Sequence, residues 1–134
     1  MMKKILSCIA VSKFLITTGR TTSQEKVKKS EILDLSDKNK FQCADWLDYP
    51  IDLYGATGGL VDQVPVICGG WSHVDFDDCY KITAKQANFV FKMSTARYEA
   101  ASVMINNTLL WITGGRDDYL HFLSSSEFIH IGCE

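Results

Sequence analysis

An apolar run that ends on a glycine pair occurs twice in this chain, and a weaker copy occurs a third time. "VPVICGG" spans 64–70, "LLWITGG" spans 109–115 and "FLITTGR" spans 14–20. The two close copies end 45 residues apart, and the weaker copy ends 51 residues before the first of them, counted from glycine to glycine. Periods of this length are typical of solenoids and propellers, in which each repeat is one supersecondary unit. The repeat therefore predicts a chain built from similar units in series.

Each unit begins with a hairpin. Ala101, Val103 and Ile105 alternate with smaller or more polar neighbours, and this period of two predicts a β-strand. Asn106 and Asn107 follow, and both tolerate the positive φ that a two-residue hairpin turn of the primed type requires. We therefore predict a tight turn at this asparagine pair.

The returning strand of the hairpin, 109–113, is almost wholly apolar. We expect it to be buried on both faces, with Trp111 in the core. It ends on a glycine doublet, where the backbone turns sharply or packs closely against a neighbour. Two further strands complete a unit. The third strand is predicted at 78–82 and 126–131, and the aromatic fourth strand at 41–47 and 89–93.

Four antiparallel strands in a repeat of this length are typical of a propeller blade. The segment "FKMSTARYEAASVMINNTLLWITGG" resembles a kelch repeat, whose pattern is an aromatic residue, a short Met/Pro-Arg turn and an apolar hairpin ending in Gly-Gly. Phe91 stands where kelch repeats usually have tryptophan, and Asp52 stands where the middle unit would have arginine. The residues that carry the pattern are Gly19, Trp46, Gly69, Gly70, Phe91, Met93, Arg97, Gly114 and Gly115.

The resemblance covers about 14–131 and implies an all-β fold, an incomplete kelch-type β-propeller of four-stranded antiparallel blades. It implies a partial blade over 14–47, a full blade over 54–93 and a partial blade over 98–131. It also implies that Arg97 reaches towards backbone carbonyls of the neighbouring blade.

Closed rings of this family have about six blades, and this chain has about two and a half. We favour a fragment of a longer propeller protein. Self-association through open blade edges and a partial propeller are the alternatives.

The start of the chain and its cysteines bear on the compartment. Residues 1–12 carry two lysines and a short apolar stretch, which predicts a secretory signal peptide, with a disordered start as the alternative. Cys68 ends one predicted strand and Cys79 begins its antiparallel neighbour, so we hypothesise a disulfide between them, with two buried free thiols as the alternative. Asn106 lies in an "NNT" glycosylation sequon. A secreted protein is favoured, and a cytoplasmic one is the alternative.

Composition and motifs exclude several functions. The net charge of −2 gives no electrostatic footprint for nucleic acid or an anionic membrane, and no apolar run is long enough to span a membrane. Cys68, His73 and Cys79 lack the paired spacing of a zinc site. No catalytic or cofactor signature occurs in the sequence. We therefore expect no cofactor, no metal and no enzymatic activity.

Proteins with kelch-like repeats mostly bind other proteins, so the resemblance implies a non-enzymatic protein–protein interaction module with a partner of unknown identity. One alternative is a non-functional truncated gene product. Another is a remnant of a copper enzyme like galactose oxidase. That chemistry needs a tyrosine cross-linked to a cysteine and converging histidines, and the three histidines here lie in loop and strand positions.

Overall fold

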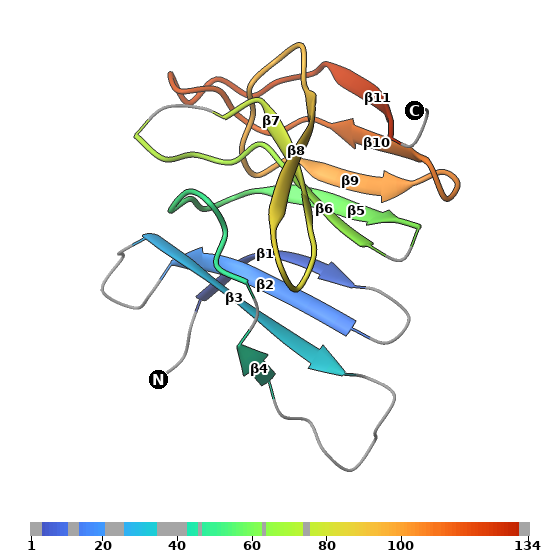
Figure 1. Cartoon of the computed structure of the whole chain (residues 1–134). Coiled ribbons are helices and arrows are strands. Elements are labelled where there is room, and N and C mark those ends of the chain that lie inside the picture. The colour runs from blue at the N-terminus through green and yellow to red at the C-terminus, as the bar shows by residue number, and fades with distance from the viewer. Residues whose placement is uncertain are drawn as a thin grey trace.

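The computed structural model describes residues 4–10, 14–20, 26–34, 43–45, 47–62, 64–73 and 76–131. These residues form three antiparallel β-sheets (Figure 1). The strand orders are β1-β2-β3-β4 in the first sheet, β5-β6-β7-β8 in the second and β9-β10-β11 in the third. Each sheet follows the order of its strands along the chain, as expected of successive blades.

The first sheet contains four strands, one more than the sequence predicted. Its strands are β1 (Lys4–Ala10), β2 (Phe14–Arg20), β3 (Lys26–Asp34) and β4 (Cys43–Asp45). β1 pairs with β2 in an antiparallel register that joins Ile9 to Ile16. Residues 4–10 are a strand in the structure, within the segment for which the sequence left a signal peptide or a disordered start open. The apolar stretch after the two lysines suits a strand as well as it suits a leader, and removal by a signal peptidase stays a prediction.

The second sheet lies between the other two. It contains β5 (Thr57–Val61), β6 (Val64–Cys68), β7 (Asp78–Ile82) and β8 (Ala87–Lys92). Its first strand, β5, contacts β1 on one side and β9 on the other. Figure 1 shows β9, β5 and β1 one above another, so the first strands of the three sheets lie side by side.

The third sheet contains β9 (Ala101–Met104), β10 (Leu109–Thr113) and β11 (Ser126–His130). Its hairpin differs from the predicted primed turn. Asn106 and Asn107 do not have positive φ; instead the Asn106 carboxamide oxygen accepts hydrogen bonds from the Thr108 and Leu109 amides at 2.9 and 2.8 Å. The side chain thus takes the place of a backbone acceptor, and this local bonding closes the loop without a left-handed residue.

One hydrophobic core lies between the second and third sheets. Its buried members are Val61, Val66, Cys68, Cys79, Met93, Leu110, Ile112, Ile129 and Ile131. A second core lies on the opposite face of the second sheet and includes Tyr49, Leu53, Ala56, Ile67 and Ile82. Because Val66 and Ile67 point into different cores, β6 is buried on both faces.

β10 does not share this burial. Leu110 and Ile112 are fully buried against the second sheet, but the alternating residues Leu109, Trp111 and Thr113 are only half-buried. The expectation that 109–113 is buried on both faces, with Trp111 in the core, is wrong for the described chain. The reason is physical: within the described ranges no further sheet covers the second face of the third sheet.

Candidate interaction surface

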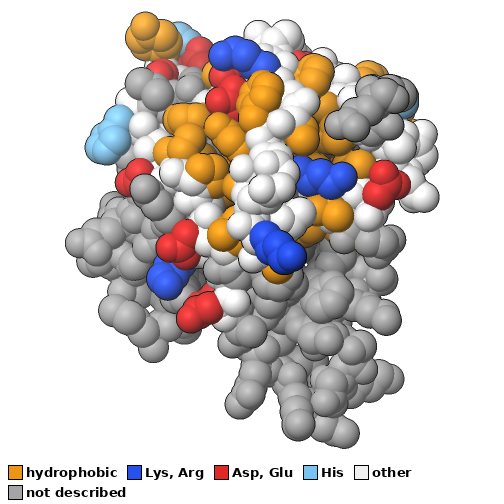
Figure 2. All heavy atoms as spheres, in the orientation of Figure 1, with side chains coloured by type: hydrophobic (Ala, Val, Ile, Leu, Met, Phe, Trp, Pro, Cys, Tyr) orange, Lys and Arg blue, Asp and Glu red, His pale blue; other side chains and the backbone are white. Residues whose placement is uncertain are grey.

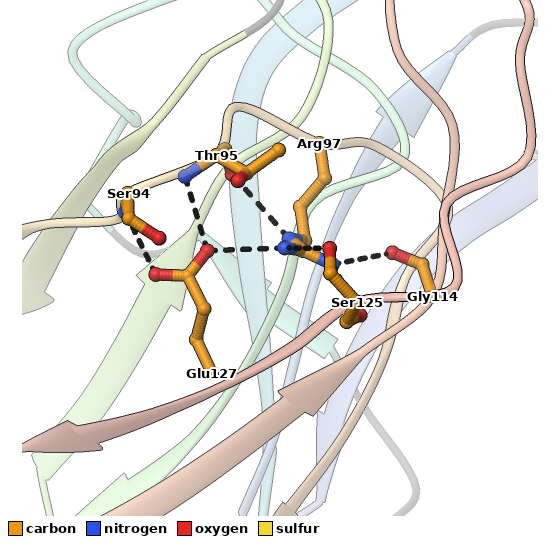
Figure 3. A network of polar contacts seen from close by, with 6 residues as sticks. All are labelled: Ser94, Thr95, Arg97, Gly114, Ser125 and Glu127. Atoms are coloured by element: carbon orange, nitrogen blue, oxygen red, sulfur yellow. Dashed lines mark hydrogen bonds and ion pairs between the residues drawn. The ribbon is translucent and has the colours of Figure 1, made fainter.

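Arg97 lies in the connection between β8 and β9, and its side chain is fully buried. Its guanidinium makes five hydrogen bonds, the full number of its N–H donors (Figure 3). Nη1 donates to the carbonyl oxygens of Gly114 and Ser125 at 2.8 and 3.0 Å, and Nε donates to the carbonyl of Thr95 at 3.3 Å. Nη2 donates to the Ser125 hydroxyl at 3.1 Å and to Glu127 Oε1 at 3.0 Å. The side chain thus reaches carbonyls of the third sheet and its loops.

Glu127 completes this network from β11. Its Oε2 accepts the Ser94 amide at 2.7 Å, and its Oε1 accepts the Thr95 amide at 3.1 Å (Figure 3). Burial alone would raise the pKa of Glu127. The hydrogen bonds from Ser94, Thr95 and Arg97 outweigh burial and hold the pKa below its usual value. The Glu127 carboxylate is therefore stable in its charged form at neutral pH.

The Arg97 backbone ties the same residue to the second sheet. The amide of Gly70 donates to the Arg97 carbonyl at 2.9 Å, and the Arg97 amide donates to the carbonyl of Phe76 at 3.3 Å. Arg97 therefore links the glycine doublet of the second sheet, through its main chain, to the doublet of the third, through its side chain. Since every donor is satisfied and the guanidinium is buried, this site is structural and has no free capacity to hold a ligand.

The glycine doublets allow the close approach that these links require. Gly69, Gly70, Gly114 and Gly115 all have positive φ, between 65° and 106°. A Cβ on Gly115 would lie 2.6 Å from the carbonyl oxygen of Tyr98. The sharp turn and close packing that the sequence indicated at these positions are both present.

Cys68 and Cys79 form a disulfide in the structure. They are register partners on β6 and β7, and their Cα atoms are 4.1 Å apart. The Gly69 amide donates to the Asp78 carbonyl, so the cysteines form a non-hydrogen-bonded pair, the position at which antiparallel side chains lie closest. The pairing proposed from the sequence is therefore the one that the fold brings together.

The other predicted residues have separate places. Gly19 lies in β2, paired with Ile5 and Val27, and has no doublet partner. Phe91 lies in β8 and packs, partly buried, against the core between the second and third sheets. Asn106 is exposed, as a glycosylation site must be. Trp46 lies outside the described residues.

A loop that the sequence did not single out has the most defined surface geometry. It begins at Asp117, whose carboxylate accepts the Tyr119 and His121 amides at 3.0 and 2.9 Å and contacts His121 Nδ1 at 3.1 Å. The main chain adds two bonds, from Leu120 to the Asp117 carbonyl and from Asp117 to the His121 carbonyl. Desolvation would raise the pKa of Asp117, but the bonds from His121 and Tyr119 outweigh it and lower the pKa. This segment is therefore fixed by its own hydrogen bonds.

The fixed loop displays large apolar side chains to solvent. Tyr119 is 80% exposed and Phe122 is 79% exposed, and Leu120 between them is exposed as well. The Arg116 guanidinium lies over the Phe122 ring, 4.7 Å from its centroid. We call residues 116–122 together with Trp71 and His73 the loop surface.

Trp71 joins the two loops of this surface. It follows the glycine doublet of the second sheet, and its indole Nε1 donates to Asp118 Oδ1 at 2.8 Å. Its ring makes an edge contact with Tyr54 and a tilted contact with His73. Figure 1 shows the loops that follow β6 and β10 at the same end of the molecule, and Figure 2 shows histidine and acidic side chains along that margin. The loop surface thus spans the second and third sheets.

Sequence reasoning places 71–77 and 116–124 after the glycine doublets and before the predicted third strands, and it gives these connections no function. The signal that it passed over is the run Tyr119–Phe122, which places three large apolar residues in a loop. Which of them stand in solvent depends on the Asp117 hydrogen bonds, and a linear pattern does not encode those bonds.

Two observations on the described residues concern other functions. Among them, no three His, Cys, Asp or Glu side chains gather in a way that could hold a metal ion. Within the same ranges, no helix is long and apolar enough to cross a membrane. The expectations of no cofactor, no metal and no enzymatic activity stay predictions.

Comparison with known proteins supports the fold. No protein-family model matches the chain, and no curated protein matches it either. Solved structures do match, among them the structure of YjhT, with a TM-score of 0.80 and 15% sequence identity over 93% of this chain. This chain spans 42% of the length of that protein.

YjhT is a protein of the β-propeller type. The chain has an all-β fold of that type, with antiparallel sheets of three and four strands.

Proposed function

We propose that this chain is a non-enzymatic protein–protein interaction module built from kelch-like repeats, and that the loop surface binds its partner. The observation that carries the proposal is the exposure of Tyr119, Leu120 and Phe122 on a loop held by Asp117. Exposed apolar side chains that cluster on a soluble protein mark interaction sites more often than chance. Aromatic residues and arginine also dominate the binding energy of protein interfaces.

The rigidity of the loop supports the same proposal. A binding loop that is already ordered loses less conformational entropy when its partner docks. The Asp117 bonds, the Trp71–Asp118 bond and the Arg116–Phe122 contact order the loop surface before any partner arrives. Asp117 and Asp118 give this surface an acidic character, so we expect a partner with an apolar recess and basic residues around it.

We also propose that the protein is secreted. The Cys68–Cys79 disulfide is weakly consistent with an extracellular protein, because disulfides persist in oxidising environments. A secreted protein with a glycan on the exposed Asn106 fits this environment.

The test compares partner capture by three forms of the whole chain. The double variant Y119S/F122S removes the two most exposed aromatic side chains of the loop surface. F89S is the matched control, because Phe89 is also a large exposed side chain but lies on β8. Quantitative mass spectrometry should show a set of proteins bound by the wild type and by F89S and lost from Y119S/F122S.

A photo-cross-linking residue at position 120 should then label the captured protein directly, and its purified form should bind Y119S/F122S at least about tenfold more weakly. Equal capture by the wild type and Y119S/F122S would refute the proposal.

A further inference from the structure

The third sheet has an apolar face with nothing packed against it in the described part of the chain. Val103, Trp111 and Phe128 form a row across β9, β10 and β11, since Trp111 is the register partner of both others. Phe128 is 64% exposed, and its ring stacks on Trp111 with 6.2 Å between centroids. Ile105 is exposed beside this row. These four residues are called the open face.

In the second sheet, Val66 and Gly59, the equivalents of Trp111 and Val103, are buried, and Lys81, the equivalent of Phe128, is half-buried. There Val66 pairs with Gly59 and Lys81, as Trp111 pairs with Val103 and Phe128. Val66 is fully buried in the core against the third sheet. A Cβ on Gly59 would come within 2.9 Å of Leu110 Cδ1, so the strand at Gly59 directly contacts the third sheet. The open face of the third sheet therefore corresponds, in strand register, to the face of the second sheet that packs against the third sheet.

The surface that would fit such a face can be read from the same repeat. Ile112 faces the core between the third and second sheets, and Ile67 holds the same strand position in the second sheet and is buried on its far side. The sequence keeps isoleucine at the corresponding position of β2, Ile16. The first sheet thus has an isoleucine at the same strand position. In the third sheet, the isoleucine at that position packs against the neighbouring second sheet.

We propose that two copies of this chain associate head to tail, with the open face of each copy packed on the first sheet of the other. Each copy has three sheets, so two copies would place about six in a ring, a usual size for a closed propeller. The chain matches 42% of the length of YjhT, so two copies correspond to most of one such protein. A head-to-tail dimer that closes into a ring covers the open face and the first sheet of both copies at once.

The first test measures mass. Light scattering behind a sizing column, over a range of concentrations, should give twice the 15.1 kDa of one chain. V103K places a charge on the open face, at the position equivalent to the buried Gly59, and should weaken the dimer at least about tenfold, and F128D should do the same. F89K is the control, because Phe89 is 55% exposed on the second sheet and lies away from the proposed contact; it should remain dimeric.

A second measurement identifies the contact. A photo-cross-linking residue at position 128 should join two copies, and mass spectrometry should place the attached peptide within residues 4–34. A monomer at every concentration, masses that grow without limit, or a V103K dimer as tight as the wild type would each overturn the proposal. Cross-links that lead back to the third sheet would also overturn it, because they would indicate face-to-face pairing.

Discussion

Arg97 is a buried cation at the junction of two sheets, and its environment decides whether it stabilises the fold. A buried guanidinium is tolerated only when its donors are satisfied and a counter-charge is near. Here two carbonyls of the third sheet and its loops, one hydroxyl and the Glu127 carboxylate meet that condition, together with the carbonyl of Thr95.

Removing this side chain should therefore be costly. R97A should lower the free energy of unfolding by about 3–5 kcal/mol, because it leaves the Glu127 carboxylate without its counter-charge and the Gly114 carbonyl without the Arg97 donor. R97K should recover only part of that loss, because a lysine ammonium cannot reproduce a planar five-donor array. Urea unfolding followed by tryptophan fluorescence measures both.

K92A is the control for the loss of a positive charge. Lys92 forms an exposed ion pair with Asp77 at 3.2 Å, and its removal should change stability by no more than about 1 kcal/mol. If R97A and K92A had similar small effects, the structural role given to Arg97 would be wrong.

The lowered pKa of Glu127 predicts a dependence of stability on pH. The pKa of this carboxyl is held below its ordinary value of 4.5 in the folded protein, so its contribution to stability is fully present above that pH and is lost as the pH falls through the folded pKa. The wild type should exceed E127Q in stability at about pH 7, and the difference should shrink towards about pH 3. Urea titrations at both pH values measure it, and a difference that grows on acidification would contradict the assignment.

At the scale of single elements, replacing either glycine of the doublet after β10 by alanine should destabilise the protein, but not to the same extent. Gly114 has a φ of 68° and open space around a Cβ, whose nearest neighbour would be the Leu123 carbonyl oxygen at 3.7 Å. G114A should therefore cost about 1–2 kcal/mol, the penalty of a left-handed residue. G115A should cost about 1–3 kcal/mol more, because its Cβ would meet the Tyr98 carbonyl.

Thermal and urea unfolding of the two variants give the comparison. Equal effects of G114A and G115A would mean that close packing at the end of β10 does not constrain the doublet.

Individual strands were more predictable than the turns between them. The strands at 78–82 and 109–113 lie where alternation and the glycine doublets placed them, because those signals are local. The turn at Asn106 was assigned the wrong type, because the asparagine side chain replaces a backbone acceptor there. β1 was missed as a strand, because a short apolar stretch after lysines fits both a strand and a leader.

At the scale of the whole molecule, the repeat predicted three units in series, and the propeller-type arrangement follows from stacking them. The loop surface could not be predicted in the same way. Its order depends on contacts between loops that are far apart in the sequence, such as Trp71 and Asp118. Burial was overestimated for β10, since an apolar sequence does not reveal whether a neighbouring sheet is present.

The central claim is that sheets formed by segments about 45 residues apart pack face to face. Thr57 on β5 and Ser102 on β9 test it most directly, because the Thr57 hydroxyl donates to the Ser102 hydroxyl at 2.6 Å across the two sheets. T57C/S102C should form a new disulfide under mild oxidation of the folded protein, seen as two thiols protected from alkylation by mass spectrometry, and should not form it in urea. T57C/S126C is the control pair and should stay reduced. If both introduced thiols of T57C/S102C were alkylated in the folded protein, the stacked-sheet arrangement would be contradicted.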